Sequence, residues 1–501
     1  MATATPDRPS LVAASLARSR LGTSQVASFA LSAVAPLTVS AGVVPIAFAV
    51  TGLTGLPIVF PAVASILALF AVGYIAMVRL VPNAGAFYAL ITHGLGRQVG
   101  VAAAFMAWAG YSCFALALLG SFGAGADGLA RDWAGFSAPW WMWALGAWAL
   151  AGILGLIRIK SVSTVLGVLL LGELLVALMY AAVFLLHPAG GSIPTQTLSP
   201  TNLIAPGMGA AIALAVLSFV GFEGPAAYSE NTRNQGTVGR AIYTSLAAAA
   251  GVYFLFAFAL IVTVGQDQIV AVSAEGGANT VFDLAAVHLP APLVDLGWLF
   301  FTTSMFAALV AFRSICDRYQ FSLGREGVLP PAFARTSTRT GAPITASLLM
   351  STLSAAVIAV FALTGLDPLL QLFYYGAGLG GFIILALLVL TSIGIVRYFS
   401  RIPAEAAQVT RWQGQTAPIL ATGALLTMLV LVLANFDVLL GVSPHSPLRW
   451  ALPATVLLPA AGGLVWARIL RARQPETYQA IGLGPNAIGR RSTTQAVTET
   501  A

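Results

Sequence analysis

The chain is long, apolar and weakly charged. Of its 501 residues, 58% are hydrophobic and only 8% are charged, whereas soluble domains contain about 25% charged residues. The 50 Gly and 27 Pro are spread through apolar sequence, which is typical of membrane helices. The composition excludes a soluble enzyme, and we expect an all-α polytopic membrane protein.

The net charge of +7 does not indicate a nucleic-acid partner. Lys and Arg occur singly or in small groups at the ends of apolar segments, whereas phosphate binding needs them clustered on one face. The two cysteines, Cys113 and Cys316, are too few for a disulfide framework or a Cys-based metal site. We expect no metal, no nucleic acid and no cofactor other than a coupling ion.

Twelve apolar segments are long enough to cross the bilayer, which takes about 20 residues per helix. They are residues 25–51, 56–79, 97–124, 139–157, 162–186, 207–229, 241–264, 292–317, 343–364, 369–397, 417–435 and 449–468. Residues 1–24 form a predicted N-terminal tail. Residues 469–501 form a predicted C-terminal tail, polar from Gln474 and disordered.

The distribution of basic residues predicts the orientation. With the N-terminus in the cytoplasm, all but two of the 24 Lys and Arg residues lie on the cytoplasmic side, the exceptions being Arg131 and Arg449. Basic residues resist translocation, so this asymmetry favours an even number of spans with both termini cytoplasmic. We therefore expect a multi-pass protein of the cytoplasmic membrane, in contact with the lipid bilayer.

Two spans contain Gly and Pro near their middle. The first span carries them within residues 36–45 and the sixth within residues 218–225. Transporters commonly place broken helices at matching positions of inverted repeats, although Gly and Pro are also simply frequent in membrane helices. We predict a 5+5 inverted repeat over residues 25–186 and 207–397, with helices 1 and 6 broken and two further helices over 417–468.

Three ionisable side chains lie at membrane depth, where each costs about 2.5 to 3.5 kcal/mol on insertion scales. Glu223, in the sixth-span break, could bind a cationic group, carry a proton, or brace the break by accepting backbone N–H groups. Glu173, midway along the fifth span, could serve in coupling or brace two helices as a neutral acid. Arg313, near the cytoplasmic end of the eighth span, could be functional, or its long side chain could simply extend to the cytoplasmic membrane interface.

Hydroxyl and aromatic side chains are further candidates for binding the coupling ion or the substrate. Thr302, Thr303 and Ser304 could coordinate Na⁺ or bind substrate, although such hydroxyls often bond their own helix. Aromatic residues that could line a pocket between helices, or pack in the core, are Tyr111, Phe219, Phe222, Tyr374 and Tyr375.

Enzyme signatures are absent from the sequence. None of the four histidines forms an H-E-x-x-H pair, and there is no P-loop. Ion gradients remain as the energy source for a transporter. The rival classes are a channel, for which no span shows a continuous polar stripe, and a sensor, for which the tails are too short to form an output domain.

Four motifs together resemble the amino acid-polyamine-organocation permeases, which have the leucine-transporter fold. They are Gly221-Phe222-Glu223 followed by residues 227–234, Arg318 to Pro330 with the R-x6-R-[DE]-G-x-L-P pattern and the downstream Gly341-Ala342-Pro343, the segment from Pro82 to Tyr88, and a loose glycine break at Ser40-Ala41-Gly42-Val43.

The resemblance implies a substrate site at the two breaks, between Ser40, Ala41, Gly42 and Val43 of the first span and Ser218, Phe219, Val220, Gly221, Phe222 and Glu223 of the sixth, with Tyr111 nearby. Unwound backbone would bind the carboxylate and amine of the substrate, and Phe219 or Phe222 would act as the gate. Alternating access would rock one bundle of helices against the rest.

The sequence also departs from the family pattern. Ser40 replaces the first glycine of the usual Gly-x-Gly, and Glu173 stands where many proton-linked relatives place a Lys. That carboxylate could accept a proton, or bind Na⁺ together with Thr303 and Ser304. We predict a secondary transporter for amino acids or related amines working by proton symport, with a sodium-coupled carrier or an exchanger as the alternative.

Overall fold

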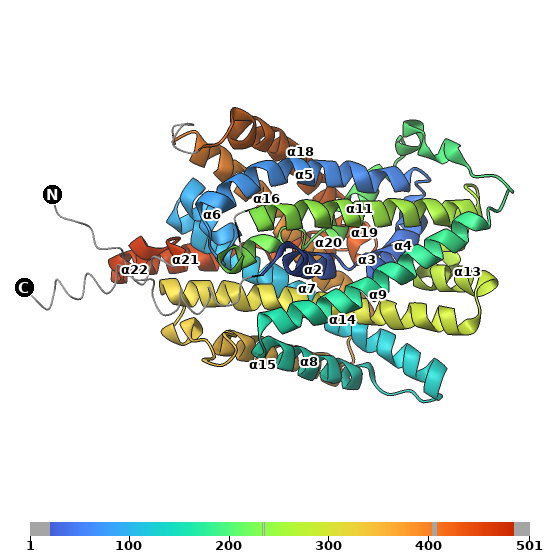
Figure 1. Ribbon diagram of the computed structural model, residues 1–501, viewed down its shortest axis with the longest axis horizontal. Helices are drawn as coiled ribbons and strands as arrows, with labels where there is room; N and C mark the ends of the chain where they lie inside the picture. The colour runs from blue at the N-terminus through green and yellow to red at the C-terminus, as the bar shows by residue number, and fades with distance from the viewer. Residues whose placement is uncertain (1–20, 233, 235, 403–407, 485–501) are drawn as a thin grey trace, which may run out of the picture.

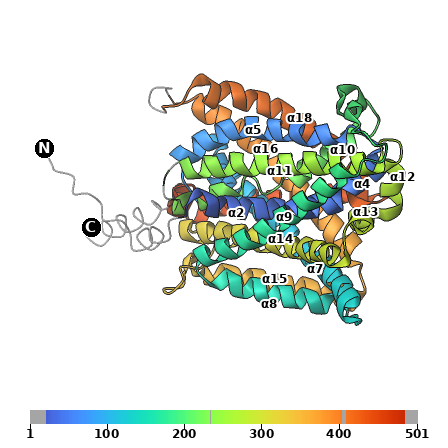
Figure 2. The same ribbon diagram turned by 45° about the vertical axis from the view of Figure 1, so that its right-hand side comes forward.

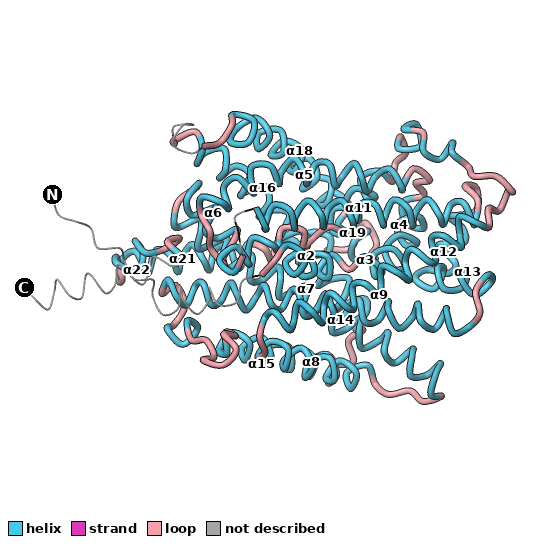
Figure 3. Tube along the Cα trace, viewed as in Figure 1, coloured by secondary structure: helices cyan, strands magenta, loops and turns pink. Residues whose placement is uncertain are grey.

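The computed structural model describes residues 21–232, 234, 236–402 and 408–484, and this part of the chain is almost entirely helical. Figures 1 and 2 show long helices running side by side, and Figure 3 shows only short loops between them. Outside the helices the described residues contain one isolated bridge, between Leu21 and Thr232. The expected all-α membrane architecture is therefore confirmed.

Ten helical segments of the described chain are long and apolar enough to cross a membrane. They are the first span Thr23–Thr51, α5 (Leu56–Leu80), α7 (Arg97–Ala134), α9 (Ile159–Leu186), α11 (Gly236–Val264), α14 (Ala291–Glu326), α15 (Ile344–Thr364), the segment Pro368–Phe399 ending in α16 (Tyr375–Phe399), the segment Trp412–Ala434 ending in α18 (Ala417–Ala434), and the segment Leu448–Arg473, formed by α20 (Leu448–Ala454) and α21 (Leu457–Arg473).

Two shorter apolar helices, α8 (Trp140–Leu156) and α10 (Met208–Ser218), coincide with the fourth and sixth predicted spans. Each predicted apolar segment thus corresponds to a helix. α7 and α14 continue beyond their predicted ends, to Ala134 and Glu326, because polar residues extend these helices past the apolar core. α7 packs against α14, α16 and α21 and lies at the centre of the bundle.

The first span is broken at Ala35, which has a φ of 50°. The helix α2 (Thr23–Val34) ends there, and α3 (Pro36–Thr38) leads through a π-helical turn, Val39–Val43, into α4 (Val44–Thr51). Pro36 explains the position, because proline lacks an N–H and disfavours helical backbone at the preceding residue. The predicted break at Ser40-Ala41-Gly42-Val43 is therefore wrong in position: these residues are helical.

The sixth span is broken between α10 and a 3₁₀ segment, Gly224–Asn231. Gly221 in the connecting turn has a φ of 112°, a conformation that favours glycine. A Cβ atom on Gly221 would lie 2.5 Å from the Cβ of Ala33. The two breaks therefore touch each other, and the absence of a side chain at Gly221 is what allows the contact.

Short helices lie between the spans, and one, α22, follows the last span. They are α6 (Phe87–Leu95), α12 (Ile269–Gly276), α13 (Thr280–His288), α19 (Phe436–Leu440), α22 (Pro475–Ala480), and the 3₁₀ turns Thr195–Leu198, Pro200–Leu203, Gly277–Asn279 and Pro331–Ala334.

The described ends of the chain lie on one face of the bundle. The backbone N–H of Leu21 donates to the carbonyl of Asn231 at 2.7 Å. The backbone N–H groups of Gly482 and Gly484 donate to the carboxylate of Glu326 at 2.5 and 2.9 Å. Where disorder was expected from Gln474, the chain instead forms α22 and buries Ile481, because Glu326 supplies acceptors for its backbone. Residues 485–501 lie outside the described part.

Candidate functional site

A cavity of about 130 Å³ lies where the two broken spans meet. Its wall includes the break residues Ala33, Val34 and Ala35 of the first span and Ser218 and Val220 of the sixth. The rest of the wall comes from α3, α4, α7, α10, α14, α16 and α19, from the π-helical turn Val39–Val43 and from the segment leading into α16. The cavity lies on the side of the breaks facing α4 and α10, away from the chain ends.

The first-span break brings two oppositely polarised helix ends together. α2 ends at Val34 and α3 begins at Pro36. The C-terminal end of a helix attracts positive charge and the N-terminal end attracts negative charge, because carbonyl and N–H groups there lack intrahelical partners. The cavity therefore has, at Ala35, a local environment suited to a group that carries both charges.

Tyr253 of α11 connects the two breaks. Its hydroxyl lies 3.0 Å from the carbonyl oxygen of Val34 and 3.0 Å from that of Ser218, donating to this pair. The phenol is fully buried, and its ring packs against Phe219 with centroids 5.3 Å apart. Sequence reasoning missed Tyr253, because nothing in α11 marks one tyrosine as the partner of two distant carbonyls.

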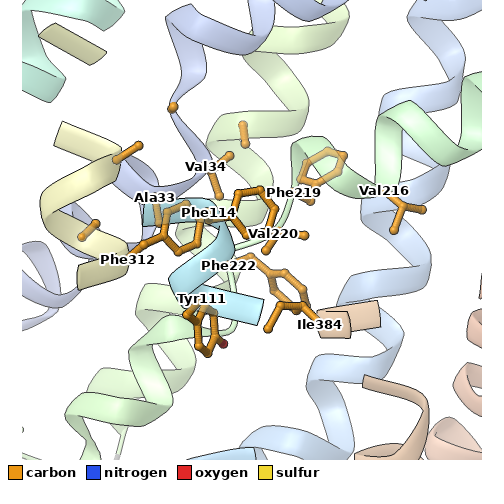
Figure 4. Packing of buried hydrophobic residues seen from close by; sticks show 14 of the residues in the cluster. Ala33, Val34, Tyr111, Phe114, Val216, Phe219, Val220, Phe222, Phe312 and Ile384 are labelled. Atoms are coloured by element: carbon orange, nitrogen blue, oxygen red, sulfur yellow. The ribbon is translucent and has the colours of Figure 1, made fainter. Parts of the chain in front are cut away.

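Phe114 of α7 and Phe312 of α14 form the aromatic wall of the cavity. Their rings stack at a centroid distance of 4.7 Å and an interplanar angle of 13°, and both line the cavity. Figure 4 shows them beside Ala33 and Val34. These two residues were not among the predicted aromatic candidates, and neither lies within a motif.

The predicted gate residues lie outside this wall. Phe219 is fully buried against Tyr253. Phe222 is buried edge-on to Phe70 of α5, at 6.3 Å. Neither is among the residues lining the cavity, so both stabilise the packing behind the sixth-span break.

Glu223 is buried and held by hydrogen bonds. The Tyr111 hydroxyl donates to Oε1 at 2.8 Å, and the Gly221 backbone N–H donates to Oε2 at 3.0 Å. The Tyr74 hydroxyl also donates to the Glu223 carbonyl at 3.3 Å. This geometry matches the bracing role considered for Glu223: the carboxylate fixes the turn at Gly221 and ties it to α7.

Glu173 of α9 has a different environment. It is 1% exposed, and the Ser304 hydroxyl of α14 and the backbone of Leu37 face its carboxylate. Neither completes a hydrogen bond to it, and no other described residue does. Thr38 donates to Ser304 at 3.0 Å. Glu173 thus lies where the first-span break, α9 and α14 converge, with two unpartnered oxygen atoms.

The remaining predicted site residues divide between the cavity and the core. Val43, Ser218 and Val220 line the cavity. Residues that the structure places outside its wall are Ser40, Ala41, Gly42, Phe219, Gly221, Phe222, Glu223 and Tyr111. Of the two tyrosines predicted near the tenth span, Tyr374 lines the cavity and Tyr375 does not.

The three hydroxyl side chains predicted as candidates in the eighth span have different surroundings. Ser304 faces Glu173, whereas Thr303 bonds the Phe300 carbonyl of its own helix at 3.3 Å. The Thr302 hydroxyl is buried without a partner among the described residues. Arg313 does not extend to an interface: it is 3% exposed and donates to the Ser347 carbonyl at 2.7 Å.

A polar network links elements on the opposite side of the breaks. Arg325, at the end of α14, donates to both carboxylate oxygens of Glu230 at 2.7 Å. Arg318 donates to the Asn231 side chain at 2.8 Å, and its guanidinium lies 4.2 Å from the Tyr228 ring centre. Such paired and stacked arginines join the 3₁₀ segment of the sixth span to α14.

Comparison with protein families gives one match. The model of the amino acid permease family covers residues 21–460 of this chain. The chain belongs to the amino acid permease family. The predicted resemblance to amino acid-polyamine-organocation permeases is thereby confirmed, and this permease is a membrane transporter rather than an enzyme. A comparison with curated proteins finds no relative that matches the permease.

Proposed function

We propose that this permease is a proton-coupled symporter of the cytoplasmic membrane that carries amino acids by alternating access. Two broken helices that meet at a cavity support this reading, because such breaks create substrate sites near the bilayer midplane. We include in this proposal a 5+5 inverted repeat with two additional helices, because the two breaks lie in the first and sixth spans, which are equivalent positions of two five-helix halves.

The substrate head group would bind at the first-span break. The end of α2 would attract the ammonium group, and the backbone N–H groups that follow Pro36, which itself has none, would attract the carboxylate. Tyr253 and Glu223 would hold the breaks in shape without contacting substrate, since Tyr253 is bonded to Val34 and Ser218, and Glu223 to Gly221.

Glu173 carries the coupling proposal. A carboxylate this deeply buried, with only the Ser304 hydroxyl and the Leu37 backbone facing it, is costly to keep charged, so in this arrangement it holds a proton or a cation. When the first-span break moves relative to α14, the surroundings of Glu173 change with it. The binding and release of a proton would thereby be linked to the conformational change.

The network at Glu230 and Arg325 supports an outward-facing state. The cavity lies on the far side of the breaks from this network, and opening to the other side would require separating the 3₁₀ segment of the sixth span from α14. The distribution of basic residues supports a cytoplasmic location for the closed side, which also holds the described chain ends.

The test uses full-length protein in liposomes and an equimolar amino acid mixture. Wild type accumulates substrate under an inward-directed proton gradient. Glu173→Gln loses this accumulation but still exchanges external for internal substrate, because exchange moves no net proton. Glu275→Gln, an exposed acid in α12, is the matched control and behaves as wild type. Gradient-driven accumulation by Glu173→Gln would contradict the proposal.

Sodium coupling is the second candidate, and one observation favours it. Glu173, Ser304 and Thr38 gather oxygen atoms from three elements, which is the ligand type that hard cations prefer. Replacing Na⁺ with choline discriminates the two. Uptake that needs Na⁺ and survives a protonophore would establish sodium coupling in place of proton coupling.

A further inference from the structure

The wall of the cavity is apolar, and this limits the side chain that a substrate can carry. Among the described residues that line it, none has a charged side chain. Aliphatic and aromatic groups dominate, including Val43, Ile46, Leu118, Phe114 and Phe312. Burying an unpaired charge against such a surface costs far more than burying an apolar group gains.

Three polar side chains lie in the wall, those of Thr38, Ser218 and Tyr374, and two of them already donate to other groups. The Ser218 hydroxyl donates to the Leu214 carbonyl at 2.8 Å. The Thr38 hydroxyl donates to Ser304 at 3.0 Å. None of these three hydroxyls carries a negative charge, so none of them can neutralise an ammonium or guanidinium group at the end of a side chain.

The acidic residues nearest the breaks do not supply the negative charge that the cavity wall lacks. Glu223 does not line the cavity, and its two carboxylate oxygens already accept from Tyr111 and Gly221. Glu173 faces Ser304 and Leu37 and is also outside the wall. A cationic side chain in the cavity would therefore have no carboxylate to pair with.

The size of the cavity sets the scale of the side chain. Its volume of about 130 Å³ is comparable to an apolar cavity of about 150 Å³ that holds a benzene molecule. A branched aliphatic or a phenyl group fits this space. The stacked rings of Phe114 and Phe312 present a flat surface against which either group can pack.

We propose that the substrates of this permease are neutral amino acids with apolar side chains, such as leucine, isoleucine and phenylalanine. Amino acids with charged side chains and polyamines are excluded by the cavity wall. This inference rests on the proposed function, because it takes the cavity to be the substrate site.

The first experiment measures binding, which does not depend on coupling. Purified full-length protein is incubated with tritiated leucine, and unlabelled isoleucine, phenylalanine, lysine, glutamate and putrescine are added as competitors. We expect isoleucine and phenylalanine to compete, and the three charged compounds to be at least about a hundredfold weaker, because each would leave a charge unpaired. Equal competition by lysine or putrescine would overturn the inference.

A size variant tests whether this cavity is the site. Ala377 lines the cavity and is half-buried, so Ala377→Leu reduces the space. We expect phenylalanine affinity to fall at least about tenfold and alanine affinity to change little, since added bulk excludes the larger group first. Ala356→Leu, on the exposed face of α15, is the control. Equal losses for both ligands, or none, would overturn the assignment.

The two proposals fail in different ways. If charged amino acids bind and are accumulated under a proton gradient, the proposed preference for apolar side chains is refuted and the proposed proton coupling is retained. If leucine binds but its accumulation does not depend on the proton gradient, proton coupling is refuted and the preference for apolar side chains is retained. If no amino acid binds, both are overturned.

Discussion

Gly221 offers a sharp test of the contact between the two breaks. Its φ of 112° suits glycine, and a Cβ atom there would lie 2.5 Å from the Cβ of Ala33 and 3.2 Å from its carbonyl carbon. Gly221→Ala therefore imposes two separate penalties: strain in the backbone, and overlap with α2.

The magnitudes can be worked out separately. A side chain in a sparsely populated backbone region such as this costs about 1–3 kcal/mol, and forcing an extra carbon into a packed interior costs about 1–3 kcal/mol. Because the overlapping atoms belong to a helix end rather than to a flexible side chain, we expect both to apply. Gly221→Ala should destabilise the protein by about 2–6 kcal/mol and impair substrate binding.

Two control variants separate the penalties. Gly365 has a φ of 70° with open space around it, so Gly365→Ala measures strain alone. Gly146 has open space and no positive φ, so Gly146→Ala measures neither. The assay is the apparent Tm of the purified protein at one heating rate, with leucine binding as the second readout. If Gly221→Ala matches Gly365→Ala in both readouts, the contact with Ala33 does not matter and the reasoning is refuted.

Three further variants address the hydrogen-bond networks. Tyr111→Phe should lower stability by about 1–3 kcal/mol, seen as a reduced Tm, because a buried carboxylate loses a donor; an unchanged Tm would contradict the bracing role of Glu223. Glu326→Gln should release the segment around Gly482, which limited proteolysis would detect as faster cleavage near the C-terminus than in wild type. Arg325→Lys removes the paired hydrogen bonds to the two carboxylate oxygens of Glu230, because a lysine ammonium lacks the planar guanidinium geometry. A membrane-impermeant reagent added on the closed side should then reach the two breaks more readily than in wild type. Unaltered access of the reagent would argue against a closing role for this ion pair.

The spans could be predicted from the sequence because they depend on local composition. A stretch of apolar residues long enough for the bilayer forms a helix wherever it occurs. The predicted fourth and sixth spans contain α8 and α10, although these two helices are themselves shorter than the ten spans. The exact ends of the helices were not predicted, because α14 continues to Glu326 through polar residues that pack against other loops.

The site was predicted less well. Pro36 was the signal that marks the first-span break, but the glycine at Gly42 suggested a position several residues later. Proline acts through its missing N–H and its effect on Ala35, whereas Gly42 lies in the π-helical turn Val39–Val43, which keeps the chain helical between α3 and α4. The sixth-span break was placed correctly, because Gly221 and Pro225 both lie close to it.

Long-range partners could not be read from the sequence. The bond between Tyr111 and Glu223 joins residues from different helices, as does the stack of Phe114 on Phe312. An aromatic residue that lines a cavity has the same local pattern as one in the core, and only the packing of whole helices distinguishes them.

Mass-spectrometric profiling of solutes accumulated by proteoliposomes would test the central claim most directly. Full-length protein is supplied with a mixture of amino acids and polyamines under an inward-directed proton gradient, with and without a protonophore. The account predicts that neutral apolar amino acids accumulate and that the protonophore abolishes their accumulation. Accumulation of polyamines or charged amino acids, or uptake that persists with the protonophore and needs Na⁺, would contradict it.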